Sequence, residues 1–183
     1  MALVLSCLPA IADDEQGLGT YKFVVPPGSP FVPLAESSGP AGAPTGQSYS
    51  GQLLISGTFR AAWGLIGGIP SHIRLKFYPD QASKAFLPYE EDSFEDVTTK
   101  HPVKELSFLN EEQALANLVP KNLYRHLKDK RLKTVSGTAT VSIEGYATNV
   151  DCDRRWYATT FVAVTKSSVR AVSKTTSQTG VCQ

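Results

Sequence analysis

The sequence has little excess charge and no long apolar run. Its 183 residues carry 18 Lys and Arg against 17 Asp and Glu, which gives a formal net charge of +1. A charge this close to zero creates no overall field that attracts nucleic acid or an anionic membrane, so nucleic acid is not expected as a partner. The longest apolar stretch near an end, Ala2 to Ile11, is about half the length needed to cross a bilayer, which excludes a transmembrane helix.

Residues that bind metals or perform nucleophilic catalysis are also sparse. The three histidines, His72, His101 and His126, form no H-x-x-H pair, and none lies within a few residues of a cysteine. We therefore expect no metal site, no cofactor and solvent-facing histidines. No G-x-S-x-G elbow marks a nucleophilic serine. The pattern offers no catalytic residue set, which leaves a hydrolase without a recognisable motif as the third of three functional alternatives.

The first twelve residues have the pattern of the end of a secretory signal peptide. An apolar run is followed by small residues, Ala10 and Ala12, at the two positions that a signal peptidase requires, and then by acidic residues. No Lys or Arg precedes the apolar run, so we expect the true start to lie upstream. The alternatives are an ordinary N-terminal strand or helix, and a lipoprotein box with Cys7 acylated.

The cysteine count agrees with export. Removal of residues 1–12 leaves only Cys152 and Cys182, an even number in a compartment where disulfides persist. The prediction is a periplasmic or secreted protein with a disulfide between them. That disulfide would close a loop of about 31 residues and stabilise the fold by roughly 3–4 kcal/mol in the loop-entropy model.

Residues 13–46 are rich in proline and glycine and precede a single globular domain, residues 47–183. The proline density opposes helices and regular strand pairing, which predicts an extended, partly disordered arm. Within it, residues 21–25 form a short β-prone segment. Docking of Phe31, Val32 and Leu34 on the domain is the alternative.

The domain shows strand periodicity, a helical segment and strand periodicity again. Apolar residues alternate with polar ones along residues 53–63, 73–77 and 137–147, which is the pattern of half-buried strands. Between them, Asn110 with its acidic followers predicts a capped helix start, and Pro120 separates this helix from a second one over residues 121–129. The small residues of 137–147 predict a bent strand that another backbone approaches closely.

This order predicts a mainly β domain with a helical insertion, of the α+β class. It resembles an OB-like Greek-key barrel, in which strands one to three are followed by a helix and strands four and five. The resemblance spans about residues 48–165 and carries no family motif. The alternative is a two-sheet β-sandwich with a helical crossover.

Two stretches are candidates for partner binding. In the first, Arg154, Arg155, Trp156 and Tyr157 combine planar donors with aromatic faces, residue types that are enriched where proteins bind partners. The alternative is a structural role, with Trp156 in the core and the arginines paired with local carboxylates. The second is a basic helix whose exposed face carries Lys121, Arg125 and Lys128, a candidate docking surface for an acidic partner or an anionic glycan. The alternative is an ordinary solvated helix face.

The acidic run over residues 90–96 lacks the ligand order of a calcium loop, and we interpret it as a solvated loop. The sequence therefore predicts an exported, non-catalytic binding or accessory protein of the bacterial cell envelope, of inhibitor, immunity or accessory type, with an acidic protein as a candidate partner. The second alternative is a module for a small molecule or glycan, with Trp63 and Tyr146 in its groove.

Overall fold

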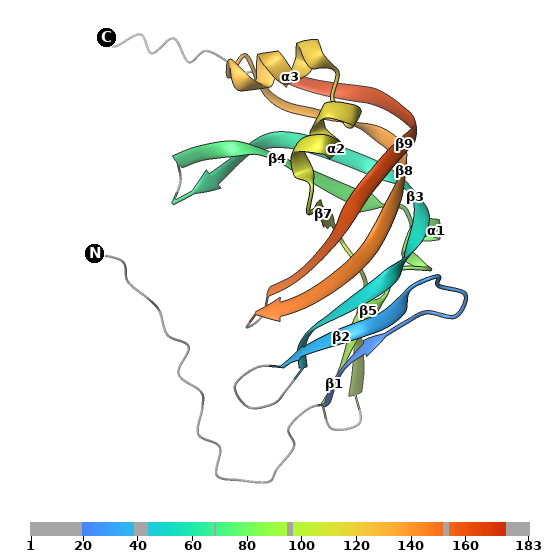
Figure 1. Ribbon diagram of the computed structural model, residues 1–183. Coiled ribbons are helices and arrows are strands. Elements are labelled where there is room, and N and C mark those ends of the chain that lie inside the picture. Colours follow the sequence, from blue (N-terminus) through green and yellow to red (C-terminus); the bar gives the residue numbers. More distant parts are fainter. Residues whose placement is uncertain (1–19, 39–43, 68, 95–96, 152–153, 175–183) are drawn as a thin grey trace.

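The computed structural model describes residues 20–38, 44–67, 69–94, 97–151 and 154–174 (Figure 1). The predicted signal peptide, the lipidation candidate Cys7 and the predicted disulfide between Cys152 and Cys182 fall outside the described residues. Among the described residues, no helix has the length and apolar character that crossing a membrane requires.

The protein is mainly β, with two sheets and three short helices in the described part of the chain, as the sequence predicted at this level. The smaller sheet contains β1 (Thr20–Val24), β5 (Tyr89–Phe94) and β6 (Val97–His101). The larger sheet contains β2 (Val32–Ser38), β3 (Pro44–Ile66), β4 (Ile69–Pro79), β7 (Leu106–Phe108), β8 (Leu132–Asp151) and β9 (Arg154–Lys174). The helices are α1 (Gln81–Lys84), α2 (Glu111–Leu118) and α3 (Lys121–Lys128).

The strand pairings of the larger sheet form a closed circuit. Strand β3 pairs antiparallel with β4 along one edge and with β8 along the other. Strand β8 pairs antiparallel with β9, β9 pairs parallel with β7, and β7 pairs antiparallel with β4. Strand β2 adds to the N-terminal part of β3. The long strands β3, β8 and β9 curve together, and α2 and α3 lie near one end of them (Figure 1).

The apolar periodicity of the sequence matches the observed core. Ile55, Phe59 and Ala61 of β3 are buried, as are Val141 and Ile143 of β8. The predicted helices are present as α2 and α3, and their apolar stripes complete the same core with Leu115, Leu118 and Leu127. Burial of one face of each element against the others is what these alternations require.

A β-bulge at Gly145 reverses the alternation at the end of β8. Gly145 has φ +63°, a conformation that glycine adopts at little cost, and the register shifts between Glu144 and Ala147. Tyr146 consequently points inward and is only 3% exposed. Strict alternation along residues 137–147 would place Tyr146 on the face opposite to Val141 and Ile143, and this is wrong because a period-two pattern does not reveal an inserted residue.

Asn110 does not cap α2 with its side chain, contrary to the sequence prediction. Instead its Oδ1 accepts a hydrogen bond from the backbone N–H of Phe161 at 2.8 Å, and its Nδ2 donates to the Phe161 carbonyl at 2.8 Å. The amide therefore continues the short parallel ladder between β7 and β9 beyond its last backbone pair, Phe108 with Thr159. A neighbouring strand offers this side chain two backbone partners, whereas a cap offers it one.

The described part of the predicted arm forms paired strands. Residues 20–24 pair with β5, and residues 32–38 pair with β3, while Phe31 is only 2% exposed. Pro26, Pro27 and Pro30 lie between these strands. Pro33 lies in β2 beside a register shift, and β2 is an edge strand of its sheet. Prolines at these places remove few ladder hydrogen bonds, which explains the pairing.

Close approach at Gly137 generates a test of the core. A Cβ at this residue would lie 2.2 Å from the Ser168 carbonyl oxygen and 2.7 Å from the Phe59 ring. We expect Gly137→Ala to lower the free energy of unfolding by about 1–3 kcal/mol, because the neighbouring backbone must move. Urea denaturation measures this, with the exposed Ser167→Ala as control, expected within about 0.5 kcal/mol of wild type. Equal stability of the two variants would contradict the observed packing.

Candidate functional site

The acidic residues of β5 divide between the two faces of the smaller sheet. Because side chains alternate along a strand, Glu90 and Asp92 share one face and Glu91 lies on the other. Glu91 is flanked in register by Lys22 of β1 and Lys100 of β6, and its oxygens lie 2.9 Å and 3.6 Å from the two ammonium groups. Lys22 lowers the pKa of Glu91 by hydrogen bonding to its charged form.

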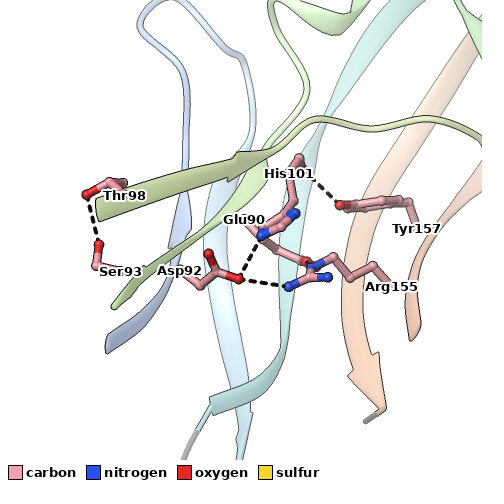
Figure 2. Close-up of polar contacts among 7 residues, drawn as sticks. All are labelled: Glu90, Asp92, Ser93, Thr98, His101, Arg155 and Tyr157. Carbon is pink, nitrogen blue, oxygen red and sulfur yellow. Dashed lines mark hydrogen bonds and ion pairs between the residues drawn. The ribbon is translucent and has the colours of Figure 1, made fainter. Parts of the chain in front are cut away.

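The other face of β5 meets β9 of the larger sheet through a charged network (Figure 2). Arg155 Nε lies 3.0 Å from Glu90 Oε2, and Arg155 Nη2 donates to Asp92 Oδ2 at 3.1 Å. Glu90 has no exposed surface, and the Arg155 side chain is 26% exposed. A carboxylate with no access to water needs such a partner, since an uncompensated buried charge is strongly destabilising. Arg155 therefore joins the two sheets.

His101 extends this network to the end of β6. Its Nε2 lies 2.7 Å from Asp92 Oδ2, so Asp92 contacts both a histidine and an arginine. Its carbonyl oxygen accepts a hydrogen bond from the Tyr157 hydroxyl at 3.1 Å. His101 therefore has structural partners and is not the solvent-facing residue that the sequence suggested.

Three tyrosines surround the Glu90 carboxylate. Tyr146 packs against Tyr49 and stacks on Tyr157, with ring centroids 5.7 Å and 6.3 Å apart. Burial raises the pKa of all three phenols, and the negative charge of Glu90 raises them further. The Tyr146 hydroxyl donates to the Pro88 carbonyl at 2.9 Å. The three tyrosine rings thus pack together next to the charged network.

A pocket of about 420 Å³ opens beside this network. The residues that line it come from the end of β6, the segment leading into β7 and the start of β9: Lys100, His101, Pro102, Lys104, Glu105, Arg155 and Tyr157. No serine, threonine or cysteine is among the described residues that line it, and Asp92, the partner of His101, lies outside the lining. The described residues contain no group of three or more side chains arranged to hold a metal ion.

The second candidate site is the surface of α3 and the start of β8, which we term the basic surface. Six of its residues are exposed cations: Lys121, Arg125, Lys128, Lys130, Arg131 and Lys133. Asp129 is the only acidic residue within residues 121–133. Leu127 on the opposite side of α3 is buried. Lys128 and Lys130 lie over the rings of Tyr124 and Trp63, 5.0 Å and 5.5 Å from their centroids.

The two predicted partner-binding stretches lie at opposite ends of one hairpin. Arg154 pairs with Asp151 at the turn between β8 and β9, whereas α3 directly precedes Leu132, which pairs with Lys174 at the far end. Trp156 is 51% exposed and Tyr157 is 5% exposed, so the tyrosine contributes to the core in place of the tryptophan. The side chain of Arg154 is outside the described part.

The predicted groove residues are also separated. Tyr146 is buried beneath the charged network, while Trp63 lies toward the other end of β3 and donates from Nε1 to the Leu127 carbonyl at 2.8 Å. Trp63 lines a different pocket, of about 370 Å³, together with Tyr124, His72 and Lys128. The structure thus places Trp63 beside the basic surface and Tyr146 away from it.

Sequence reasoning missed Glu90, Asp92 and His101. The acidic run was interpreted as a solvated loop, but most of it forms β5 and buries Glu90 and Glu91. The available signal was the interleaving of Tyr89 and Phe94 with the acids, which is compatible with a strand. Nothing local indicates that Arg155, 65 positions after Glu90, provides the compensating charge.

No protein-family model, curated protein or solved structure gives a match to this chain. The fold and the two sites define a mainly β protein with a buried charged junction between its sheets and an exposed basic surface at one end.

The ion pair between Glu90 and Arg155 makes a quantitative prediction. We expect Arg155→Met to lower the free energy of unfolding by about 3–5 kcal/mol, because it removes the cation nearest to a buried carboxylate. The double variant Glu90→Gln with Arg155→Met is expected to recover part of this loss. Urea denaturation of wild type, both single variants and the double variant measures the coupling.

Lys100→Met serves as the control, since Lys100 is exposed and Glu91 keeps Lys22 as its nearer cation, so this substitution is expected to cost much less stability than Arg155→Met. Strictly additive effects of the Glu90 and Arg155 substitutions would show that the two groups do not interact as the structure indicates.

Proposed function

We propose that the chain is an exported binding module, built on an OB-like barrel, that docks an acidic partner protein on its basic surface. The observation that carries the proposal is the group of six exposed cations, accompanied in sequence by a single acid, Asp129, on α3 and the start of β8. The acids of β5, by contrast, lie in ion pairs with Lys22, Lys100 and Arg155.

The pairing circuit supports the OB-like barrel. Along the chain, the circuit contains β3, β4 and β7, then the helices α2 and α3, and then β8 and β9. Three strands, a helical segment and two strands is the order from which the resemblance was inferred, and OB-folds are five-stranded Greek-key barrels. A two-sheet sandwich fits less well, because β3 pairs with both β4 and β8 and thereby joins the two ends of the strand order.

Charge and geometry together favour a protein partner for the basic surface. The cations extend from one helix into the following strand, and their side chains are exposed. Long exposed cations on a convex helix accelerate encounter with an acidic surface and align the two partners. The proximity of Trp63, Tyr124 and their overlying lysines adds aromatic surface, which is enriched at protein interfaces.

A small glycan is the second candidate, because the pocket of about 370 Å³ next to the basic surface contains Trp63 and Tyr124 with Glu112 and His72. Aromatic rings with a few polar groups are typical of ligand pockets of this size.

Charge reversal on α3 tests the docking proposal. Binding of a fluorescent poly-L-glutamate peptide is measured by anisotropy at two salt concentrations. We expect binding that weakens with salt, and that becomes at least about tenfold weaker in Lys121→Glu with Arg125→Glu, because these cations attract the acidic chain. The matched control is Arg60→Glu with Lys166→Glu, two exposed cations elsewhere that give the same change in net charge.

Equal losses in the two double variants would mean that only net charge matters, and would contradict docking on α3. Binding of a neutral N-acetylglucosamine trimer, abolished by Trp63→Ala and insensitive to salt, would favour the glycan alternative.

Export and the disulfide are part of the proposal and have their own test. Intact-mass analysis of the natural protein is expected to show loss of residues 1–12 and a mass lower by two hydrogen atoms than that of the reduced chain, because Cys152 and Cys182 would be bridged. An unprocessed N-terminus with free thiols at both cysteines would contradict export.

A further inference from the structure

The pocket beside Arg155 has the size of a ligand site and is separate from the basic surface. Its volume of about 420 Å³ falls in the range of small-molecule pockets, about 300–1,000 Å³. It opens at the start of β9, whereas the basic surface lies at the other end of the hairpin formed by β8 and β9. The proposed docking of a protein partner on α3 therefore makes no use of it.

Once the ion pairs are assigned, one cation of the pocket lining remains outside them, Lys104. Glu105, its one acidic residue, lies 2.7 Å from Lys76 and is neutralised there. Lys104 is exposed, and no carboxylate of the described residues lies within salt-bridge distance of its ammonium group. Lys100 lies 3.6 Å from Glu91, which lies closer to Lys22. Lys104 therefore provides positive charge at the pocket wall, whereas Glu90 and Asp92 balance the charge of Arg155 and hold its guanidinium in place.

The guanidinium of Arg155 is ordered by contacts within the protein. Its Nε and Nη2 atoms are held by Glu90 and Asp92, and its Nη1 has no partner among the described residues. A guanidinium that is already ordered loses little further entropy when it binds an anion. His101, held on Asp92 through Nε2, has its other ring nitrogen on the side of Arg155 and Tyr157 (Figure 2).

The remaining wall is apolar. Pro102 and Tyr157 line the pocket, and Tyr157, which is 5% exposed, is held by its stacking on Tyr146 and its hydrogen bond to the His101 carbonyl. A rigid aromatic surface beside fixed cations is suited to a ligand with one anionic group and one flat apolar group.

We propose that this pocket binds a small organic anion, with its carboxylate or phosphate group on Arg155 Nη1 and the Lys104 ammonium group, and its apolar part on Pro102 and Tyr157. Either anion accepts hydrogen bonds from the N–H groups of Nη1, and Lys104 adds a mobile point charge. The site does not depend on the proposed docking at α3.

Titration of the full chain with phenyl phosphate and, separately, with benzoate tests this site. Isothermal titration calorimetry at neutral pH is expected to show one saturable site for at least one of the two probes. Lys104→Gln is expected to weaken that binding about tenfold, because it removes an unpaired cation and leaves the ion pairs of Arg155 intact. The control Lys166→Gln removes an exposed cation of β9 outside the pocket and is expected to bind as wild type does.

The probes also distinguish the anion. Tighter binding of phenyl phosphate assigns a phosphate group and tighter binding of benzoate assigns a carboxylate, and either result supports the site. Absence of saturable binding by both probes would overturn it. So would equal affinity in Lys104→Gln and wild type, or a loss of binding in Lys121→Glu with Arg125→Glu, which would locate the anion on α3. Ring-proton shifts of His101 on binding provide a second readout by nuclear magnetic resonance.

Discussion

The arrangement of the two sheets depends on the contact between Glu90 and Arg155. Glu90 belongs to the smaller sheet and has no exposed surface, while Arg155 belongs to the larger sheet. A buried carboxylate is tolerated only beside a well-placed cation, so each sheet carries a group whose burial depends on the other. The hydroxyls of Tyr146 and Tyr157 add hydrogen bonds to two carbonyls at the same end of the smaller sheet, those of Pro88 just before β5 and of His101 at the end of β6.

This junction changes how the charge of the protein is distributed. The sequence is almost neutral, but the acids of β5 are neutralised within the molecule by Lys22, Lys100 and Arg155. Cations of α3 have no comparable acids beside them in sequence, with Asp129 as the exception. The protein therefore has a near-zero net charge together with a strongly basic surface on α3 and the start of β8. The electrostatic attraction of a partner depends on this local surface rather than on the net charge of the whole chain.

Local pattern predicted the elements but not the long-range pairs. Strand alternation at Ile55 and Val141 and the helical spacing of Leu123 and Leu127 identified the core because one buried face leaves a periodic record in sequence. Tyr146 was misplaced because one bulge residue, Gly145, inverts that record. The sequence predicted only part of the candidate site. It indicated Arg155, but it did not indicate Glu90 and Asp92 as the partners of Arg155, since no local rule links residues that only the fold brings together.

The basic surface on α3 and the guanidinium of Arg155 differ in their exposure to water. This difference determines how strongly salt screens the charge of each. On α3 the cations are exposed, so their attraction for an anion is screened within about 10 Å at ordinary salt and mainly speeds encounter. Arg155 is partly buried and held by Glu90 and Asp92, so its field is screened less and its geometry is fixed. Because screening weakens the first effect far more than the second, exposed charge suits the proposed docking of a macromolecule, and the enclosed, oriented guanidinium suits the proposed binding of a small anion.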